Sequence, residues 1–395
     1  MIKISDKSEC CGCSACASVC AHNAITMKPD ALGFLYPEVD VSKCVECGLC
    51  EKVCAFNDDY DKSLNLSVPE AYGARHKNMS EVETSRSGAA FIAISDWILE
   101  QGGIVYGAGY ADHFRVVHKR AVTKEERDEF KGSKYVQSDM GTIFKQVKQD
   151  LRDGKIVLFS GTPCQTAGLN SYIGKKYREN LYLVDIVCHG VPSPYIWRDY
   201  LSYIEKKYKK KVSVVNFRDK GEYGWAAHKE TFIFEDGEKI TPAHSPYTEL
   251  FYKHIMLRKS CGSCHYCNTI RPSDITIADF WGWEKIDSLF NKDDRGVSLL
   301  LVNTNKGKHL FENIKNYMYI ISVKIEDCIQ PNLRKASVLD LYYNKFICDY
   351  NNKNFLKILK LYTKVGLKNN ICSYLKKIKH SLKLRLLYLK NIINL

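Results

Sequence analysis

Two groups of cysteines near the N-terminus have the spacing that binds iron–sulfur cubanes. Each follows the pattern C-x2-C-x2-C-x3-C, and together they comprise Cys10, Cys13, Cys16, Cys20, Cys44, Cys47, Cys50 and Cys54. In this pattern three thiolates surround one cluster and the fourth cysteine reaches the other cluster. The predicted ligand sets are therefore Cys10, Cys13, Cys16 and Cys54 for a first [4Fe–4S] cluster, and Cys44, Cys47, Cys50 and Cys20 for a second.

Structural zinc is the competing interpretation of these cysteines. Zinc sites normally pair two C-x2-C knuckles, whereas both groups here repeat a three-plus-one spacing, which favours iron. Ala21 and Ala55 replace the proline that usually follows the last cysteine, and this removes no ligand. Residues 1–58 are therefore expected to form a small α+β ferredoxin-type domain. Cys11 is given no role.

Five further cysteines occur where the fold can bring them together. Cys164 and Cys188 each follow an apolar strand, in KIVLFSGTPCQ and LYLVDIVCHG. Strands joined by a helix run parallel, so both cysteines are expected at the same edge of a sheet. Cys261, Cys264 and Cys267 follow in KSCGSCHYC. The residues alone favour these three, plus either sheet-edge cysteine, as ligands of a third cluster; a zinc knuckle beside two inert cysteines is the alternative.

The elements that must position these cysteines read as an α/β body with a largely parallel sheet. The stretch SRSGAAFIAISDWILEQGGIVYGAGY, for example, predicts a helix, a Gly-Gly turn and a strand. We expect a polar linker at 59–70 and the body at 71–340, with an N-terminal part of about 71–150 and a C-terminal part of about 151–340. A chain of 395 residues is long enough for two or three such domains.

The composition indicates a reducing compartment. Seventeen cysteines occur without the apolar core of a signal peptide, so the thiols are expected to be reduced in the cytoplasm. No run of eighteen or more apolar residues is present, which excludes a membrane-spanning helix on sequence grounds.

The net charge of +13 lies mainly in the last part of the chain, because residues 351–395 contain eleven Lys or Arg and no Asp or Glu. Residues 341–395 are expected to form a basic helical tail, with apolar residues from Ile371 to Ile393 on one face. Such a tail can dock on its own domain, which is favoured, contact an anionic membrane surface peripherally, or bind a partner. No nucleic-acid motif occurs.

Six stretches together resemble the coenzyme F420 hydrogenase and dehydrogenase beta-subunit family, over roughly residues 1–340. They are SRSGAAF, GGIVYGAGY, FKGSKYVQSD, VLFSGTPCQTAGL, DIVCHGVPSP and SDITIADFWGW. The resemblance implies bound FAD and a third [4Fe–4S] cluster. It matches family cysteines at Cys164, Cys188, Cys261 and Cys264, which leaves Cys267 as the fallback ligand. Ala89 departs from the family, which usually has a double glycine here.

The loop FKGSKYVQSD has groups that suit a flavin pyrophosphate: backbone amides at Gly132 and Ser133, a cation at Lys134 and a hydroxyl at Ser138. Polar loops of this kind are usually only solvated, and the resemblance shifts the interpretation toward flavin. The predicted flavin residues are Ser87, Gly88, Gly132, Ser133, Lys134, Tyr135, Gln137, Ser138, Gly161, Thr162 and Gly190.

His189 is the predicted catalytic residue, because it adjoins Cys188 and can relay the proton that accompanies flavin reduction. A hydrogen-bonded neighbour of the cluster is the alternative role. Asp279 is expected to cap a turn rather than to orient a flavin nitrogen.

These features predict an iron–sulfur flavoprotein oxidoreductase. Electrons would pass between the ferredoxin-type clusters, the third cluster and FAD, with hydride exchange with an organic substrate or the deazaflavin coenzyme F420. The alternative is a non-catalytic electron-transfer subunit of a larger redox complex. Expected partners are a redox protein or ferredoxin-like donor and a small-molecule or glycan-related substrate.

Overall fold

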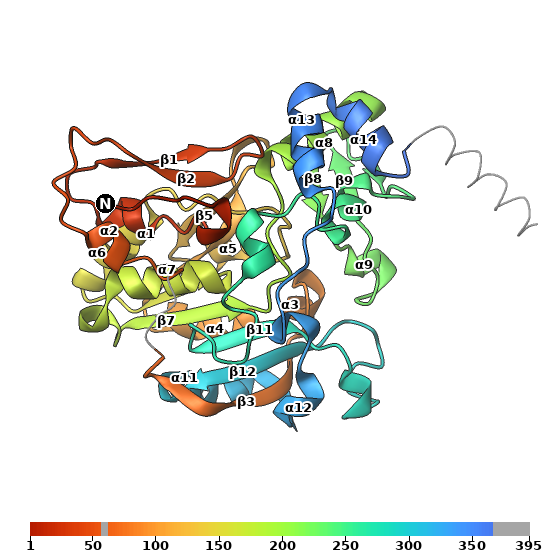
Figure 1. Ribbon diagram of the computed structural model, residues 1–395. Helices are drawn as coiled ribbons and strands as arrows, with labels where there is room; N and C mark the ends of the chain where they lie inside the picture. The colour runs from red at the N-terminus through yellow and green to blue at the C-terminus, as the bar shows by residue number, and fades with distance from the viewer. Residues whose placement is uncertain (57–61, 366–395) are drawn as a thin grey trace, which may run out of the picture.

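The computed structural model describes residues 1–56 and 62–365. The N-terminal part, here called the head (residues 1–56), contains four main elements. They are the helices α1 (Ala15–Val19) and α2 (Leu49–Lys52) and the antiparallel strands β1 (Ile25–Pro29) and β2 (Leu35–Val39). Figure 1 shows the head along one side of a larger sheet.

The two cysteine loops of the head have the same backbone conformation. Gly12 and Glu46 occupy equivalent positions with φ of 72° and 52°, and Ser14 and Gly48 with φ of 67° and 72°. Left-handed residues turn the chain sharply, so the cysteines on either side of each turn face the same way. Helices α1 and α2 begin directly after these turns.

The body is built on an eight-stranded mixed sheet with the order β13-β3-β12-β11-β7-β6-β4-β5. Its strands are β3 (Asn65–His76), β4 (Ile104–Tyr110), β5 (Val116–Ala121), β6 (Val157–Gly161), β7 (Leu181–Ile186), β11 (Ile275–Asp279), β12 (Ser298–Thr304) and β13 (Met318–Val323). Strands β4, β6, β7 and β11 run parallel, while the pairings outside them are antiparallel. The α/β body is thus confirmed, with the parallel part at the centre of the sheet.

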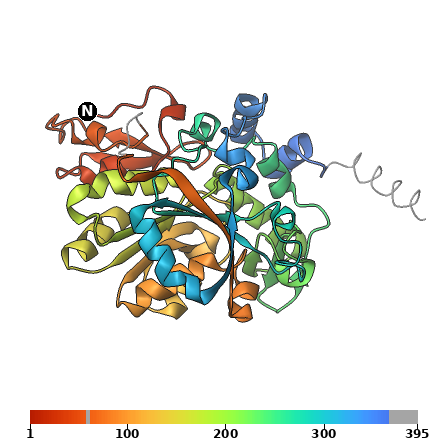
Figure 2. The ribbon, with the colours of Figure 1, turned by 90° about the horizontal axis from the view of Figure 1, so that it is seen from below.

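Successive residues of the central strands face two different helical layers, as the pleat of a strand requires. Leu158 packs in one core with α4 (Ala90–Glu100) and α11 (Asn305–Ile314), which Figure 2 shows in orange and blue. Phe159 faces the opposite core, with α6 (Ile143–Arg152) and α7 (Pro163–Ile173). Ala15 and Phe56 of the head belong to this second core, so the head packs directly against the body.

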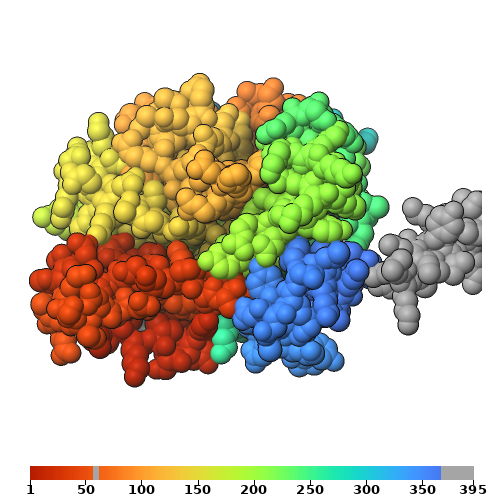
Figure 3. All heavy atoms as spheres, turned by 90° about the horizontal axis from the view of Figure 1, so that it is seen from above, coloured from red at the N-terminus to blue at the C-terminus, as the bar shows by residue number. Residues whose placement is uncertain are grey.

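A smaller unit flanks the sheet. It contains the strands β8 (Val212–Asn216), β9 (Thr231–Phe234) and β10 (Lys239–Ile240), and the helices α8 (Pro194–Tyr208), α9 (Lys220–Tyr223) and α10 (Pro246–Tyr252). Helices α13 (Tyr343–Asn352) and α14 (Phe355–Tyr362) contribute Phe346, Ile358 and Leu359 to its core. Figure 3 shows these two helices, in blue, on the same face of the molecule as the red head.

Three sequence predictions bear on these boundaries. Strand β3 begins at Asn65, within the segment expected to be a linker. The first part of the expected tail forms α13 and α14, whereas the predicted amphipathic helix lies outside the described residues. Within residues 1–56 and 62–365, none of the helices combines the length and apolar character that crossing a membrane requires.

Candidate functional site

The predicted ligands of the first cluster line one cavity. Cys10, Cys13, Cys16 and Cys54 surround a space of about 330 Å³ between the turns of the head. Backbone amides of Gly12, Ala15 and Ala17 donate hydrogen bonds to the sulfur atoms of Cys10, Cys13 and Cys16, respectively. Four thiols with amide donors match the donor set that a [4Fe–4S] cluster uses.

The predicted ligands of the second cluster lie further from the body. Cys20 and Cys50 pack in one apolar group with Cys16 and Cys54, so the two sets adjoin each other. The Ile2 amide donates to Cys50 Sγ at 3.2 Å, and the Ala24 amide donates to Cys20 Sγ at 3.3 Å. Cys44 is half-buried, while Cys47 is exposed, which places this set at the outer surface of the head.

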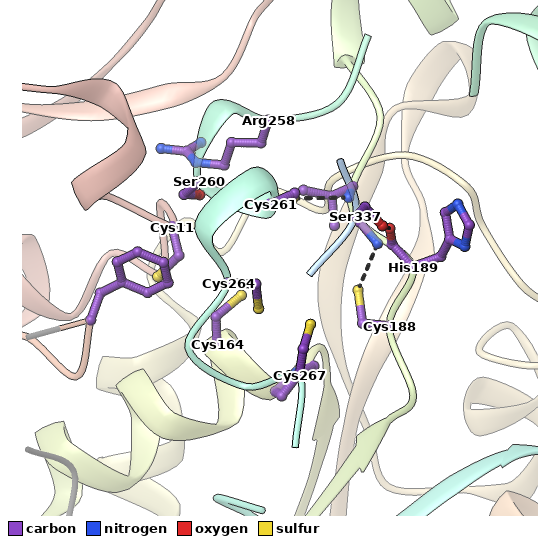
Figure 4. A pocket seen from close by; sticks show the side chains of 14 residues that line it. Cys11, Cys164, Cys188, His189, Arg258, Ser260, Cys261, Cys264, Cys267 and Ser337 are labelled. Carbon is purple, nitrogen blue, oxygen red and sulfur yellow. Dashed lines mark hydrogen bonds between the residues drawn. The ribbon is translucent and has the colours of Figure 1, made fainter. Parts of the chain in front are cut away.

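A second cavity, of about 430 Å³, is lined by six cysteines, which are Cys11, Cys164, Cys188, Cys261, Cys264 and Cys267. Three segments bring them together: the turn between β6 and α7, the end of β7, and the 3-10 helix η4 (Lys259–Ser263) with the loop after it. Figure 4 shows the thiols of Cys164, Cys264 and Cys267 close to one another, with Cys188 across from them. We call this space the body cavity.

The geometry of the body cavity fits a cluster. The Gly190 amide donates to Cys188 Sγ and the Val191 amide donates to Cys261 Sγ, both at 3.4 Å. All five cysteines predicted from the sequence line the cavity, and the thiol of Cys267 hydrogen-bonds the thiol of Cys264. The four-ligand assignment without Cys267 therefore stays a prediction.

Gly190, predicted as a flavin residue, lies in the wall of the body cavity. Its φ is 120°, and a Cβ atom there would lie 2.8 Å from Leu257 Cδ1 and 3.4 Å from Cys261 Cβ. Glycine is therefore required for the close approach of this turn to η4. The sulfur of Cys164 receives similar support, because Thr162 Oγ1 lies 3.2 Å from it.

Two residues that the sequence analysis did not assign connect the cavities. Cys11 lines both, and its thiol hydrogen-bonds Cys13 of the head and Cys164 of the body. Arg258 is 1% exposed and lines the body cavity, while its Nε donates to the Cys10 carbonyl at 2.8 Å. Neither residue belongs to a sequence motif. For Cys11, its place directly after the predicted ligand Cys10 is a feature of the sequence that could have indicated a role.

The predicted catalytic residue His189 lines the body cavity and pairs with His254, their Nε2 atoms 2.6 Å apart. His254 Nδ1 lies 2.8 Å from the Val338 carbonyl, which can only accept, so this nitrogen carries a proton. Neutral His254 then accepts from Nε2–H of His189. Burial, followed by the neighbouring His254, lowers the pKa of His189. The pair can therefore hold one proton beside the cavity.

The predicted pyrophosphate loop is partly committed to internal contacts. Gly132 and Ser133 are exposed, whereas Lys134 Nζ donates to the carbonyls of Glu129, Lys131 and Gly132. Burial lowers the pKa of Lys134 to about 7. To reach a phosphate, this ammonium group would have to leave the carbonyls.

The second half of that loop supports the head and α7. Tyr135 packs edge-on against Phe217, with ring centroids 5.6 Å apart. Gln137 Nε2 donates to the Cys11 carbonyl at 2.9 Å, and Ser138 Oγ accepts from Gln165 Nε2 at 2.9 Å.

The remaining predicted flavin residues have clear packing roles. A Cβ on Gly88 would lie 2.3 Å from the Ala74 carbonyl oxygen, so only glycine lets the chain approach β3 there. Ser87 Oγ donates to the Val297 carbonyl at 2.6 Å. Thr162 caps α7, and a Cβ on Gly161 would contact Gln165. Ala89, which replaces a family glycine, has φ of 63°, a conformation that glycine adopts more readily.

The predicted turn cap at Asp279 is wrong. Its Oδ2 accepts from Arg218 Nη1 at 2.6 Å and lies 3.7 Å from Arg86 Nη2, and its Oδ1 accepts from Trp225 Nε1 at 3.2 Å. The side chain thus joins the buried guanidinium group of Arg218 to the partly buried one of Arg86, because β11 ends beside them. Nε and Nη1 of Arg86 and Nε of Arg218 have no hydrogen-bond partner among the described residues.

A row of rings extends from the body cavity to this cationic group. His189 contacts Tyr252 with ring centroids 5.8 Å apart, and the Tyr252 hydroxyl shares a hydrogen bond of 2.6 Å with His228. His228 lies over Trp281, which stacks on Trp225 with centroids 4.5 Å apart. We call His189, Tyr252, His228 and Trp281 the aromatic row.

The charge near the aromatic row is positive. Lys220 lies close to Arg86, and its Nζ donates to the carbonyls of Ser87 and Arg295. Burial, then repulsion from Arg86, lowers the pKa of Lys220 to about 7. Burial and Arg218 lower the pKa of His228 to about 4. Asp279 pairs with both Arg86 and Arg218, and Lys220 lies beside them, so the described residues of this region favour an anionic group.

Comparison with known proteins agrees with the site. Residues 154–327 match the family model for the C-terminal region of the coenzyme F420 hydrogenase/dehydrogenase beta subunit, and residues 9–57 match the 4Fe-4S dicluster domain. Residues 154–327 are therefore similar to the C-terminal region of that beta subunit, and a dicluster module precedes them in the chain. This confirms the predicted family and an iron–sulfur electron-transfer oxidoreductase subunit.

One solved structure with a similar chain is the xenon-derivatized F420-reducing [NiFe] hydrogenase complex from Methanosarcina barkeri. The two chains are 19% identical, with a TM-score of 0.44 over 76% of this chain and 94% of that chain. No curated protein matches the sequence at a significant level.

Proposed function

We propose that the protein is an iron–sulfur flavoprotein oxidoreductase with three [4Fe–4S] clusters and FAD. It would exchange a hydride with an organic substrate or with coenzyme F420. The observation that carries this proposal is the common wall of the two cysteine-lined cavities, because Cys11 and Phe56 line both of them. Clusters separated by single side chains are close enough for direct electron exchange, which gives the body a continuous connection to the head.

Each cluster would be held by one of the cysteine sets described above. The third would use Cys164, Cys188, Cys261 and Cys264, with Cys267 outside the set. Amide donors at Gly190 and Val191 would stabilise the negative charge of the thiolates.

A bound flavin would convert one-electron steps into two-electron transfer. The aromatic row supports this part of the proposal, because it starts at the body cavity and presents Tyr252 and Trp281, which are 46% and 39% exposed. Arg86 and Arg218 would stabilise negative charge on a planar ring or on its substrate. The His189–His254 pair would hold the proton, carried on Nε2 of His189.

Anaerobic purification with analysis of iron, sulfide and flavin tests the proposal. We expect about twelve irons per chain, four for each cluster, and one FAD. Single Ala substitutions at Cys164, Cys188, Cys261 or Cys264 should each remove about a third of the iron. Cys267→Ala is the matched control and should retain it. Loss of the cluster in Cys267→Ala, with an intact cluster in Cys164→Ala or Cys188→Ala, would show that the ligand set is wrong.

The contacts of Lys134 favour a second candidate, a non-catalytic electron-transfer subunit. Its ammonium group is already satisfied by three carbonyls of its own loop, as a flavin-free body would allow. This candidate predicts the same iron content with no flavin. Flavin analysis of the purified protein therefore distinguishes the two.

A further inference from the structure

Arg258 places a buried positive charge between the head and the body cavity. Its Nη2 donates to the Leu35 carbonyl at 2.9 Å and lies 3.6 Å from Cys10 Sγ, while the guanidinium also lines the body cavity. One planar cation thus touches a predicted ligand of the first cluster and borders the site of the third. The pairing spans 248 residues of sequence.

The surrounding side chains fix this guanidinium. Gln137 Oε1 accepts from Nη1 at 3.0 Å, and the Tyr36 ring lies 4.2 Å from the guanidinium carbon. A Cβ on Gly12 would lie 2.7 Å from Nη1, so glycine at this position is what lets the cysteine loop of the head approach the guanidinium so closely. These contacts use several N–H donors of one planar guanidinium, an arrangement that the single ammonium group of a lysine does not provide.

The counter-charge of Arg258 does not come from a carboxylate. Across residues 1–56 and 62–365 it forms no ion pair with Asp or Glu, although it is 1% exposed. A buried cation without an anionic partner is strongly destabilising. The negatively charged groups that can compensate it are the thiolates, and with clusters bound, the cluster cores.

We propose that Arg258 is a positioning residue that stabilises the reduced states of the first and third clusters together, and so couples the head to the body. This inference rests on the proposed function. It assigns an order to the electron path, in which the second cluster is terminal and the first cluster is the one that exchanges electrons with the body. Cys47, the exposed ligand of the second set, fits the terminal place.

Potentiometric titration followed by electron paramagnetic resonance tests the charge. Arg258→Met should lower the reduction potentials of the first and third clusters and leave the second unchanged. For the loss of a cation at this distance we expect the equilibrium constant for reduction to fall roughly tenfold, which corresponds to about 59 mV for one electron. Gln137→Glu, which places a carboxylate beside the intact Arg258, should shift the same two clusters in the same direction.

Two controls separate charge from structure. Lys259→Met removes the neighbouring cation, whose side chain is 39% exposed and paired with Asp6, and should leave all three potentials unchanged. Arg258→Lys retains the positive charge, so the reduction potentials of the first and third clusters should stay close to their wild-type values. If Arg258→Met does not retain its clusters, Gln137→Glu and Arg258→Lys decide the outcome.

The inference is overturned if all three potentials stay at wild-type values in Arg258→Met and Gln137→Glu, or if Lys259→Met shifts them equally. Failure of the proposed function looks different, since the wild-type protein would then lack the third cluster or bind no flavin.

Discussion

Gly168 lies where α7 meets the head, and its replacement tests how tightly the two parts fit. A Cβ atom at this position would lie 2.6 Å from Cys13 Sγ and 2.8 Å from Cys13 Cβ. Ordinary contacts are about 3.5–4.0 Å, so one partner must move by about 1 Å. Helix α7 cannot easily retreat, because Ala167 and Leu169 on either side are buried in the core beneath it.

The expected energy follows from two opposing effects. Overpacking of this kind costs about 1–3 kcal/mol, whereas replacing a helical glycine by alanine stabilises by about 1 kcal/mol. Gly168→Ala should therefore lower the free energy of unfolding by about 0–2 kcal/mol, a small change. The larger effect should be on Cys13, whose displacement should cost the first cluster, or about a third of the iron.

Iron and sulfide per chain, together with the spectrum of the reduced protein, are the assay. Gly221→Ala in α9 is the matched control, because a Cβ there would meet only Asp219 Oδ1 at 3.5 Å. This control should keep all its iron. Full iron content and an unchanged spectrum in Gly168→Ala would refute the inference that α7 and the cysteine loop are closely packed.

Three further predictions follow from charge and exposure. Glu230 is buried, and burial raises its pKa to about 7, so the folded state binds a proton more tightly than the unfolded state. The free energy of unfolding should therefore fall by up to about 3 kcal/mol as pH rises from about 4.5 to about 7. Denaturation of wild type and Glu230→Gln across that range tests this, because the variant should lack the pH dependence. The opposite slope would contradict the argument. Lys134 loses its charge above pH about 7, so FAD retention should weaken between about pH 6 and 8. Lys134→Glu should lower FAD retention at every pH, whereas Lys155→Glu, at an exposed lysine, should leave it unchanged. Full FAD occupancy in Lys134→Glu would exclude this loop as the flavin site. Val41, Val45 and Leu49 are 70%, 59% and 46% exposed around the second cluster, so Val45→Asp should slow reduction by a ferredoxin-type donor on the order of tenfold and leave reduction by dithionite unchanged. The similarly exposed Leu289→Asp is the control, and equal slowing in both variants would argue against docking at this surface.

The sequence predicted the features that local rules determine. The two cysteine patterns in the head were visible from spacing, and their loops have matching left-handed turns. Cys164 and Cys188 were placed at one sheet edge by the parallel crossover rule, and β6 and β7 are indeed parallel neighbours.

Features that depend on long-range packing were not predicted. Arg258 contacts Cys10 across 248 positions, and His254 pairs with His189 across 65. Only the first residues of strand β3 fall in the predicted linker, and they were missed because the partners of this strand, β12 and β13, lie more than two hundred residues later in the chain. Asp279 was expected to cap a turn because nothing local showed that Arg86 and Arg218 converge on it.

The loop from Gly132 to Ser138 connects the proposed flavin site with the electron path. Its first half is exposed at Gly132 and Ser133, while Gln137 in its second half bonds both Arg258 and the Cys11 carbonyl. The two halves are linked by a hydrogen bond of 2.8 Å from the Val136 amide to the Lys134 carbonyl. A ligand that draws Lys134 away from its carbonyls would therefore pull on Gln137, which holds the guanidinium between the clusters. If the proposed flavin site and the proposed role of Arg258 both hold, flavin binding would be linked to the coupling of head to body through this one short segment.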